Sequence, residues 1–293
     1  MKITQFNHHR DGWNCATKEL NKIHSPNSNI LFLDWADKFF KNKTLITKPW
    51  SGILHNVLCY PDKEKYKNVI FSISDLIKKD FFIESLNKCV GIFTLCKHTK
   101  EFLERNINIP VENIKHPVDL KFKLFNLDNL KLQVVTIGQW MRRYESICEL
   151  DSNKFKKKIL TINGFEKDYQ NLNNIDFIKN LNNEQYDELL SSSIVFLDLY
   201  DSAACNTILE CISRNTPVLV NLLPATIEYL GINYPFFYQS LEEASFKLND
   251  MDLIKKTHDY LINMNKNSLS SDSFINSILN SKIYKNIKTI KIL

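Results

Sequence analysis

The feature that most constrains the fold of this chain is an alternation of short apolar runs with amphipathic stretches, which occurs twice. In the first half, the expected strands cover residues 1–6, 29–33, 68–72 and 90–95, and the expected helices cover 13–23, 35–41, 76–87 and 99–105. Strands that alternate with helices predict parallel β-α-β units. Continuous apolar runs, without a polar residue at every second position, are typical of a sheet buried on both faces.

The alternation stops after Asp119 and then begins again. Residues 120–130 show no clear period, so we expect an N-terminal domain over residues 1–120 and a C-terminal domain over 121–293. The second series predicts strands at 132–137, 158–162, 194–197 and 217–220, helices at 184–191, 207–213 and 224–230, and a largely helical tail over 252–279. Two Rossmann-like domains of this kind form a cleft, and ligands bind outside the carboxyl ends of their strands.

Composition narrows the class of protein. The 293 residues include 44% hydrophobic and 24% charged side chains, as in a globular protein. We find no run close to the roughly 20 apolar residues of a membrane span and no leader pattern at the start, and we therefore expect a cytoplasmic protein without a membrane span. The seven Cys residues form no Cys-x-x-Cys pair, a pattern typical of free thiols, and they show no zinc-ligand spacing. The net charge of +5 is too dispersed to predict a nucleic-acid partner.

The strongest motif lies between Ile175 and Leu230. The small residues 202–205 leave room for a ligand near the backbone, and a helix is expected to begin at Asn206 or Thr207. The free N–H groups of a helix N-terminus and its positive dipole suit a diphosphate. Glu210 lies about one helical turn inside, where a carboxylate can accept hydrogen bonds from a ribose diol.

The order of these segments resembles the donor-binding half of the family-4 retaining GT-B glycosyltransferases (glycosyl transferases group 1). The resemblance implies an α/β GT-B fold, in which two Rossmann-like domains face a central cleft. The resemblance implies that Glu210 binds the donor. The sequence departs from the family pattern in two places. Asn215 stands where the family has Gly before Thr-Pro-Val, and Ser202 stands where it often has a second Glu. The carboxylates nearest to Ser202 are Asp201 and Asp198, and Asp201 is one candidate to replace that Glu.

The second motif is Gly138-Gln139-Trp140-Met141-Arg142-Arg143, directly after an expected strand. Two of only five Arg residues occur here in a chain rich in Lys. The motif resembles the Gly-Arg-Leu turn of the same family, with Gln139 at the Arg position. A guanidinium group can hold phosphate oxygens through two hydrogen bonds and stabilise a leaving diphosphate. We assign this role to Arg143 in preference to Arg142.

Two N-terminal segments, expected to be loops, are candidates for contact with the acceptor or the transferred sugar. The first, residues 7–13, contains His9, Asp11, Gly12 and Trp13, and the second, residues 49–55, ends at His55. Trp can stack on a sugar, and Gly permits a ligand to approach closely. The resemblance implies that His55 contacts the transferred sugar, and a satisfied, half-buried His is the structural alternative. Asp11 is a candidate base only for an inverting enzyme, and a contact of the donor base with backbone groups is expected near Leu181.

These observations predict an enzyme that transfers a sugar from a nucleoside-diphosphate sugar, UDP- or GDP-linked, to a hydroxyl acceptor such as a glycan. The resemblance implies a hexosyltransferase-like activity with retention of anomeric configuration, in which the leaving diphosphate helps to take the acceptor proton. We expect no cofactor and no metal, because no Asp-x-Asp follows a strand. The alternatives are a nucleotide-sugar epimerase and a non-catalytic GT-B-like protein that binds glycans or acts as a scaffold; Ser202 and Gln139 favour the latter, and Glu210 opposes it.

Overall fold

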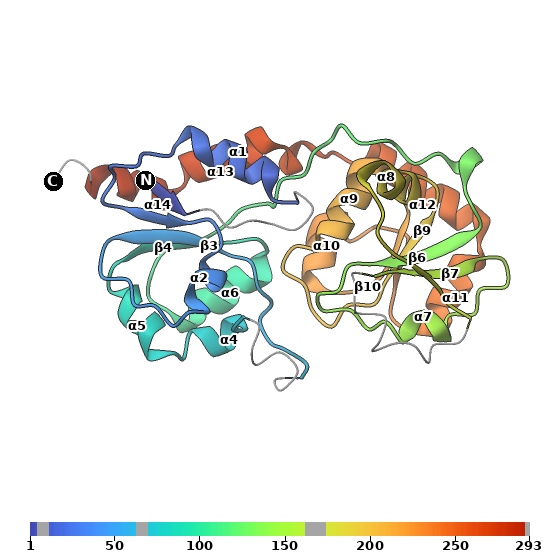
Figure 1. The fold of residues 1–293 in the computed structure, drawn as a ribbon, viewed down its shortest axis with the longest axis horizontal. Coiled ribbons are helices and arrows are strands. Elements are labelled where there is room, and N and C mark those ends of the chain that lie inside the picture. The colour runs from blue at the N-terminus through green and yellow to red at the C-terminus, as the bar shows by residue number, and fades with distance from the viewer. Residues whose placement is uncertain (5–11, 63–69, 162–173, 291–293) are drawn as a thin grey trace. The chain divides into compact units, whose positions relative to one another are not determined.

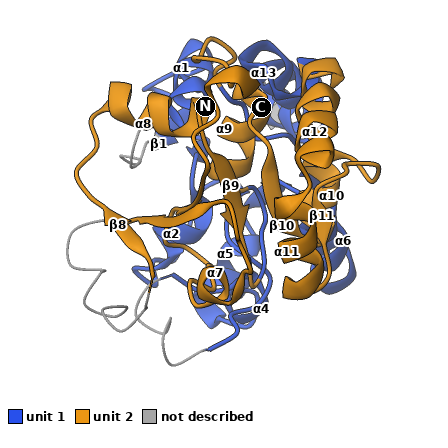
Figure 2. Ribbon diagram, turned by 90° about the vertical axis from the view of Figure 1, so that its right-hand side faces the viewer, with its two compact units in different colours: residues 1–118, 201–204, 267–293 blue, residues 119–200, 205–266 orange. Residues whose placement is uncertain are grey.

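The computed structural model describes residues 1–4, 12–62, 70–161 and 174–290. The chain forms two compact units (Figure 2). Unit 1 contains Met1–Val118, Asp201–Ala204 and Asn267–Leu293, and unit 2 contains Asp119–Tyr200 and Cys205–Lys266. Among the described residues, no helix has the length and apolar character needed to cross a bilayer.

Unit 1 is built on a parallel sheet of five strands, β1 (Lys2–Thr4), β2 (Leu31–Leu33), β3 (Trp50–Leu54), β4 (Cys89–Thr94) and β5 (Val111–Asn113), in the order β1-β2-β3-β4-β5. Helices cover both faces of the sheet (Figure 1). One face carries α1 (Asn14–Lys22), α13 (Ser271–Asn280) and α14 (Lys282–Ile290); the other carries α2 (Ala36–Phe40), α4 (Ile73–Leu76), α5 (Asp80–Leu86) and α6 (Lys97–Asn106). Since the strand order follows the chain, this sheet has no reversal of order within the described residues.

The division into units differs from the one expected from the sequence, which assigns residues 121–293 to a single C-terminal domain. Residues 267–293 belong to unit 1, where α13 packs against α1 and α14 packs against β4. The cause is burial of apolar surface, because Phe274 and Ile278 of α13 and Ile283 of α14 share a core with Trp13. A tail that looks helical in sequence carries no signal of which domain it will cover.

The third strand of unit 1 is not the expected one. A strand was expected over 68–72, but Ile70–Ser72 are not in a strand, residues 68 and 69 lie outside the described part of the chain, and Ser72 caps α4. The strand is β3, in the segment 49–55 that was expected to be a loop. A Cβ at Gly52 would lie 2.8 Å from the Leu33 carbonyl oxygen. This glycine therefore permits close contact between β2 and β3, and it does not mark a turn.

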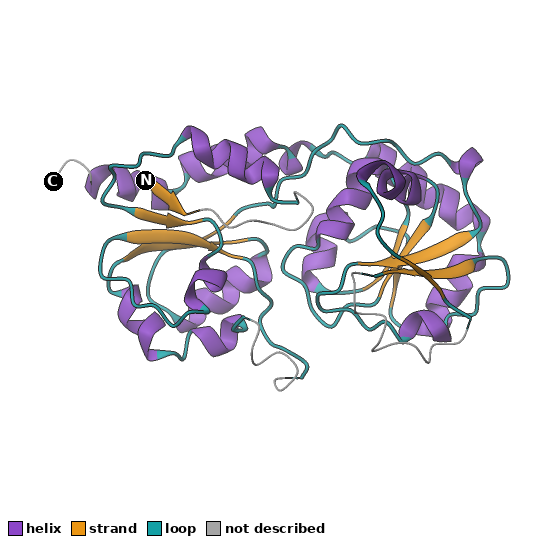
Figure 3. Cartoon of the chain, in the orientation of Figure 1, coloured by secondary structure: helices purple, strands orange, loops and turns teal. Residues whose placement is uncertain are grey.

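Unit 2 contains a parallel sheet of six strands with helices on both faces (Figure 3). The strands are β6 (Gln133–Ile137), β7 (Lys156–Leu160), β8 (Asp176–Ile178), β9 (Ile194–Leu197), β10 (Val218–Asn221) and β11 (Phe237–Tyr238). The helices are α7 (Ser146–Glu149), α8 (Asn183–Ser191), α9 (Asn206–Arg214), α10 (Pro224–Leu230), α11 (Leu241–Asn249) and α12 (Met251–Asn263). The strand order is β11-β10-β9-β6-β7-β8, which is the doubly wound Rossmann order with its reversal between β6 and β9.

Candidate functional site

The strand reversal of unit 2 locates a candidate ligand site. In open parallel sheets, ligands bind outside the carboxyl ends of the strands where the strand order reverses. Here β6 ends at Ile137 and is followed by Gly138, while β9 ends at Leu197 and is followed by Asp198. The next helix along the chain, α9, begins at Asn206. The two motifs that the sequence singled out in this half of the chain therefore meet at the sheet edge where the fold predicts a ligand.

The loops after β6 and β9 are joined by their backbones. Arg142 and Leu199 form an antiparallel bridge, the Arg143 N–H donates to the Asp198 carbonyl at 2.9 Å, and the Tyr200 N–H donates to the Met141 carbonyl at 3.1 Å. A left-handed conformation at Gly138 (φ 85°) and Met141 (φ 59°) gives the first loop its path.

The end of β10 supports the same arrangement. The Asn221 side chain accepts the Leu199 N–H and donates to the Leu199 carbonyl, both at 2.9 Å. One amide side chain therefore satisfies both backbone groups of Leu199. Because Leu199 also bridges Arg142, the ends of β6, β9 and β10 are held as one framework.

Arg142 lies at the N-terminus of α9. Its Nη2 is 3.1 Å from the Cys205 Sγ and 3.4 Å from the Thr207 Oγ1, while its Nε and Nη1 donate to the Ile137 and Trp140 carbonyls. All these partners are uncharged. The guanidinium and the positive end of the α9 dipole together create a site that favours an anion. A Cβ at Gly138 would lie 3.0 Å from Nη2, so glycine leaves room for the Arg142 head group.

Arg143, which the sequence analysis preferred for the diphosphate, points to a different partner. Its Nη1 forms a 2.7 Å ion pair with Asp198 and a 3.2 Å hydrogen bond with the Leu199 carbonyl. Its guanidinium lies 4.3 Å from the centre of the Tyr200 ring. Asp198 is buried and also accepts a hydrogen bond from Ser146. The charge of Arg143 is therefore compensated within the protein, and Arg142 is the arginine that the structure brings to the helix N-terminus.

Glu210 lies in the second turn of α9, as the sequence predicts. Its carboxylate accepts a hydrogen bond from the hydroxyl of Tyr186, a buried residue of α8. Leu181 lies in the loop between β8 and α8 and is partly buried. Glu210, Leu181, Gly138, Asn206 and Thr207 all belong to unit 2. Tyr186 was not a candidate in the sequence, because a Tyr on an amphipathic helix has no signature beyond its place on the buried face.

Asp201 and Ser202 belong to unit 1. The Asp201 carboxylate accepts the Ser202 N–H at 2.7 Å and the Leu58 N–H at 3.2 Å. Burial raises the pKa of this carboxyl above its usual range, and the backbone donors oppose the rise. The carboxylate of Asp201 is thus already bound by backbone N–H groups. These contacts fix the 201–204 segment to the loop after β3.

His55 directly follows β3. Its ring Nε2 is 2.7 Å from the Asp34 carbonyl oxygen, and its backbone N–H donates to Asp37 Oδ1 at 2.7 Å. The ring stacks on Trp35 with centroids 5.2 Å apart. A ring N–H that donates to a carbonyl leaves Nδ1 as the hydrogen-bond acceptor of the neutral imidazole. His55 is therefore half-buried and held in one orientation, and its imidazole is a polar group at the edge of the sheet.

Trp13, expected to be a platform for a sugar, belongs to the core of unit 1. It is 2% exposed, and its ring contacts those of His55, His116 and Phe274 with centroids 4.4, 4.7 and 5.7 Å away. The expectation that Trp13 stacks on a ligand is wrong, because no face of the indole reaches the surface. Gly12 lies in the turn that precedes α1. His9 and Asp11, the other acceptor-side candidates, lie outside the described residues.

Asp37, which the sequence analysis did not select, is a fully buried carboxyl beside His55. It accepts the His55 N–H and, at 2.8 Å, the Trp35 indole N–H. Burial raises the pKa of Asp37 from its usual value to about 6, against the opposing effect of these hydrogen bonds. No sequence pattern marks such a group, since an Asp in the first turn of a helix is ordinarily exposed.

The raised pKa of Asp37 has a consequence for stability. The folded protein binds this proton more tightly than the unfolded chain, so the free energy of unfolding falls as pH rises from about 4 to about 6. Relative to Asp37→Asn, which cannot titrate, the wild-type protein should lose about 2 kcal/mol between pH 4 and pH 7, at up to about 1.4 kcal/mol per pH unit. Urea unfolding of both proteins across this range measures the difference. Parallel pH profiles would contradict the assignment.

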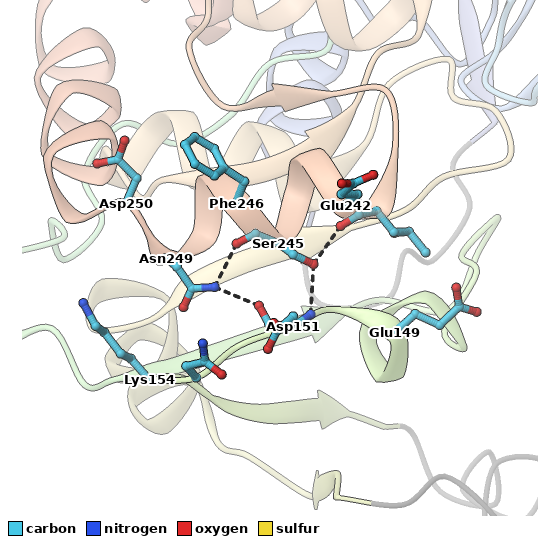
Figure 4. A pocket seen from close by; sticks show the side chains of 10 residues that line it. Glu149, Asp151, Lys154, Glu242, Ser245, Phe246, Asn249 and Asp250 are labelled. Carbon is cyan, nitrogen blue, oxygen red and sulfur yellow. Dashed lines mark hydrogen bonds between the residues drawn. The ribbon is translucent and has the colours of Figure 1, made fainter.

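A hollow of about 790 Å³ lies elsewhere on unit 2, between the segment before β7 and helix α11 (Figure 4). Within it, the Asp151 backbone bonds to Ser245 Oγ at 2.9 Å and to Asn249 Nδ2 at 2.8 Å. The segment precedes β7 and so lies at the amino end of that strand, away from the edge where parallel sheets bind ligands. None of the candidate residues derived from the sequence lines this hollow.

Comparisons with known proteins connect the fold to a class of structures. The sequence matches no protein-family model and no curated protein. Its structure is similar to sucrose-phosphate synthase from Thermosynechococcus elongatus, with a TM-score of 0.62 and 10% identity over 98% of this chain and 81% of that one. It is also similar to Anabaena HepE in complex with UDP and glucose, with a TM-score of 0.65 and 9% identity over 97% and 84% of the two chains.

A third similar structure is TarM, with a TM-score of 0.65 and 16% identity over 92% of this chain and 57% of TarM. The chain thus spans little more than half of TarM. These neighbours are GT-B glycosyltransferases, and both units of this chain have their parallel α/β architecture. At such low identity the likeness establishes the fold alone: the chain has the GT-B fold, built from two Rossmann-like α/β domains.

Proposed function

We propose that this protein transfers a sugar from a nucleoside-diphosphate sugar to a hydroxyl acceptor. The observation that carries the proposal is the position of Arg142 at the N-terminus of α9, at the strand reversal of unit 2. Two sources of positive potential converge there, as a diphosphate requires. The structural neighbours support the same chemistry, since HepE was solved with UDP and glucose.

In this proposal, unit 2 binds the donor. Arg142, Gly138 and the backbone at Asn206 and Thr207 hold the diphosphate and stabilise its charge as the sugar leaves. Glu210 accepts hydrogen bonds from the ribose hydroxyls, and the backbone near Leu181 contacts the base. Arg143 acts indirectly, because its ion pair with Asp198 fixes the loop that carries Arg142.

Unit 1 contributes the polar edge around His55. In this proposal, His55 contacts the transferred sugar through a hydrogen bond to one of its hydroxyls. The reaction retains anomeric configuration and needs no metal. An oxygen of the leaving diphosphate takes the acceptor proton, and positioning of the reactants supplies much of the rate. We further propose a glycan as the acceptor, a hexose as the sugar and the cytoplasm as the location.

A thermal-shift screen with UDP, GDP, CMP, ADP and their sugar conjugates, with and without EDTA, tests the donor site. A ligand at a hundred times its dissociation constant adds about 2.7 kcal/mol to the stability of the folded state. We expect one nucleotide to raise the melting midpoint, with no effect of EDTA, and Glu210→Ala to abolish the shift. If the folded protein responds to no nucleotide, the transferase proposal is wrong.

A further inference from the structure

One contact of the donor site has no assigned role, the hydrogen bond from Tyr186 to Glu210. The two residues are 24 positions apart and belong to different helices, α8 and α9. Tyr186 is 8% exposed, and its hydroxyl donates to Oε2 of Glu210. A hydrogen bond donated to a carboxylate oxygen favours the ionised form, because that form is the stronger acceptor. The contact therefore stabilises the charged form that a diol would bind.

The position of the Tyr186 hydroxyl is set by a firmly joined pair of helices. Asp187, the next residue on α8, pairs with the buried Arg214 of α9. Within α9, Arg214 also donates to the Glu210 carbonyl at 3.4 Å, and the hydroxyl of Thr216, which follows α9, donates to the Leu190 carbonyl of α8 at 2.7 Å. Polar contacts at several positions thus join the two helices, so the phenol approaches Glu210 from a fixed direction.

The start of α8 is fixed as well. Asn182 and Gln185 form a reciprocal capping box, in which the Asn182 side chain accepts the Gln185 N–H at 2.8 Å and Gln185 Oε1 accepts the Asn182 N–H at 3.0 Å. The cap joins α8 directly to the loop that contains Leu181. Tyr186 therefore connects the segment proposed to contact the base with the carboxylate proposed to contact the ribose.

Recognition of a vicinal diol depends on the orientation of the carboxylate plane. Two neighbouring hydroxyls can donate together only when both carboxylate oxygens face them, and a long Glu side chain loses rotamer freedom when it is held in this way. When the phenol holds one carboxylate oxygen, the Glu side chain is already ordered before the ligand binds. This is preorganisation of the site. Without the phenol, the carboxylate keeps its charge and loses one of the contacts that fix its direction.

We propose that Tyr186 is a positioning residue that orients Glu210 toward the 2′,3′-diol of the donor ribose. The inference rests on the proposed function, and it makes the site selective for ribonucleoside diphosphates over analogues that lack these hydroxyls. Tyr186 touches the carboxylate and acts on the ligand through it.

The test compares UDP and GDP with their 2′,3′-dideoxy analogues in calorimetric titrations of wild-type protein, Tyr186→Phe and Glu210→Gln. We expect Tyr186→Phe to weaken binding of the preferred ribonucleotide about tenfold, as befits one lost hydrogen bond to a charged group, and to leave binding of the dideoxy analogue unchanged. In the double variant that combines Tyr186→Phe with Glu210→Gln, the loss of ribonucleotide affinity should equal that of Glu210→Gln alone, because the two residues act through one contact.

Tyr260→Phe is the matched control. It removes a phenol that donates to the Leu230 carbonyl at 2.8 Å elsewhere in unit 2, and it should leave both affinities unchanged. Equal weakening of ribonucleotide and dideoxy analogue by Tyr186→Phe would indicate a structural role and overturn the inference, as would unchanged selectivity. If the wild-type protein binds none of the four nucleotides, the proposed donor site fails, and the inference fails with it. Circular dichroism melts confirm that each variant is folded.

Discussion

Replacing Arg142 by Met is expected to lower the rate of sugar transfer about a hundredfold or more, the loss typical when one group that stabilises developing charge is removed. The reason is the position of its guanidinium, 3.1 Å from Cys205 Sγ and 3.4 Å from Thr207 Oγ1 at the start of α9. Met has a similar length and no charge, so packing around Gly138 is largely kept. Steady-state kinetics with the donor that the nucleotide screen identifies measures the loss.

Arg143→Met is the matched comparison for Arg142→Met. It leaves the buried Asp198 without its ion-pair partner, so it should lower the melting midpoint while transfer at a temperature well below that midpoint falls much less. The reverse ranking, with transfer depending mainly on Arg143 in a stably folded variant, would restore the assignment made from sequence. The pair of variants therefore decides which of two adjacent arginines contacts the diphosphate.

The second large effect is on stability. Trp13→Ala should destabilise the protein by about 3–5 kcal/mol, the usual cost of removing a large aromatic side chain from a core. Trp13 is 2% exposed, and it packs in the core that α1 shares with α13. Urea unfolding followed by circular dichroism measures the change in the free energy of unfolding.

Trp140→Ala provides the control for Trp13→Ala, since Trp140 is 37% exposed and should cost far less stability. A sugar platform at Trp13 would give a different result, namely weaker acceptor binding with unchanged stability. Such a result would contradict the assignment of Trp13 to the core.

The sequence allowed the longer strands and several helices of unit 2 to be predicted. The strand at Ile194–Leu197 and the helix at Pro224–Leu230 have the predicted bounds, because apolar runs and a Pro at the helix start are local signals. The short strands β5, β8 and β11 were missed, because two or three residues cannot establish a period. Their pairing with longer neighbours is a property of the folded sheet.

The candidate site stays a prediction, and what can be compared with the sequence is where the structure places its residues. Gly138, the start of α9 and Glu210 lie at one sheet edge as expected, because spacing relative to strand ends is a property of sequence. Spacing does not decide which of two adjacent side chains pairs with a distant Asp, and so it could not separate Arg142 from Arg143. The burial of Trp13 depends on α13, which is more than 200 residues away in the chain.

The return of residues 267–293 to unit 1 has a consequence for synthesis on the ribosome. Unit 2 has all of its sequence available once Lys266 has emerged. Unit 1 begins first, yet α1 cannot bury its apolar face against α13 until Asn280 has been added. Domains generally fold as units during translation, with the N-terminal one first. Here the topology reverses that order for the two units, because β1 precedes unit 2 along the chain and α13, which completes the core of unit 1, follows it.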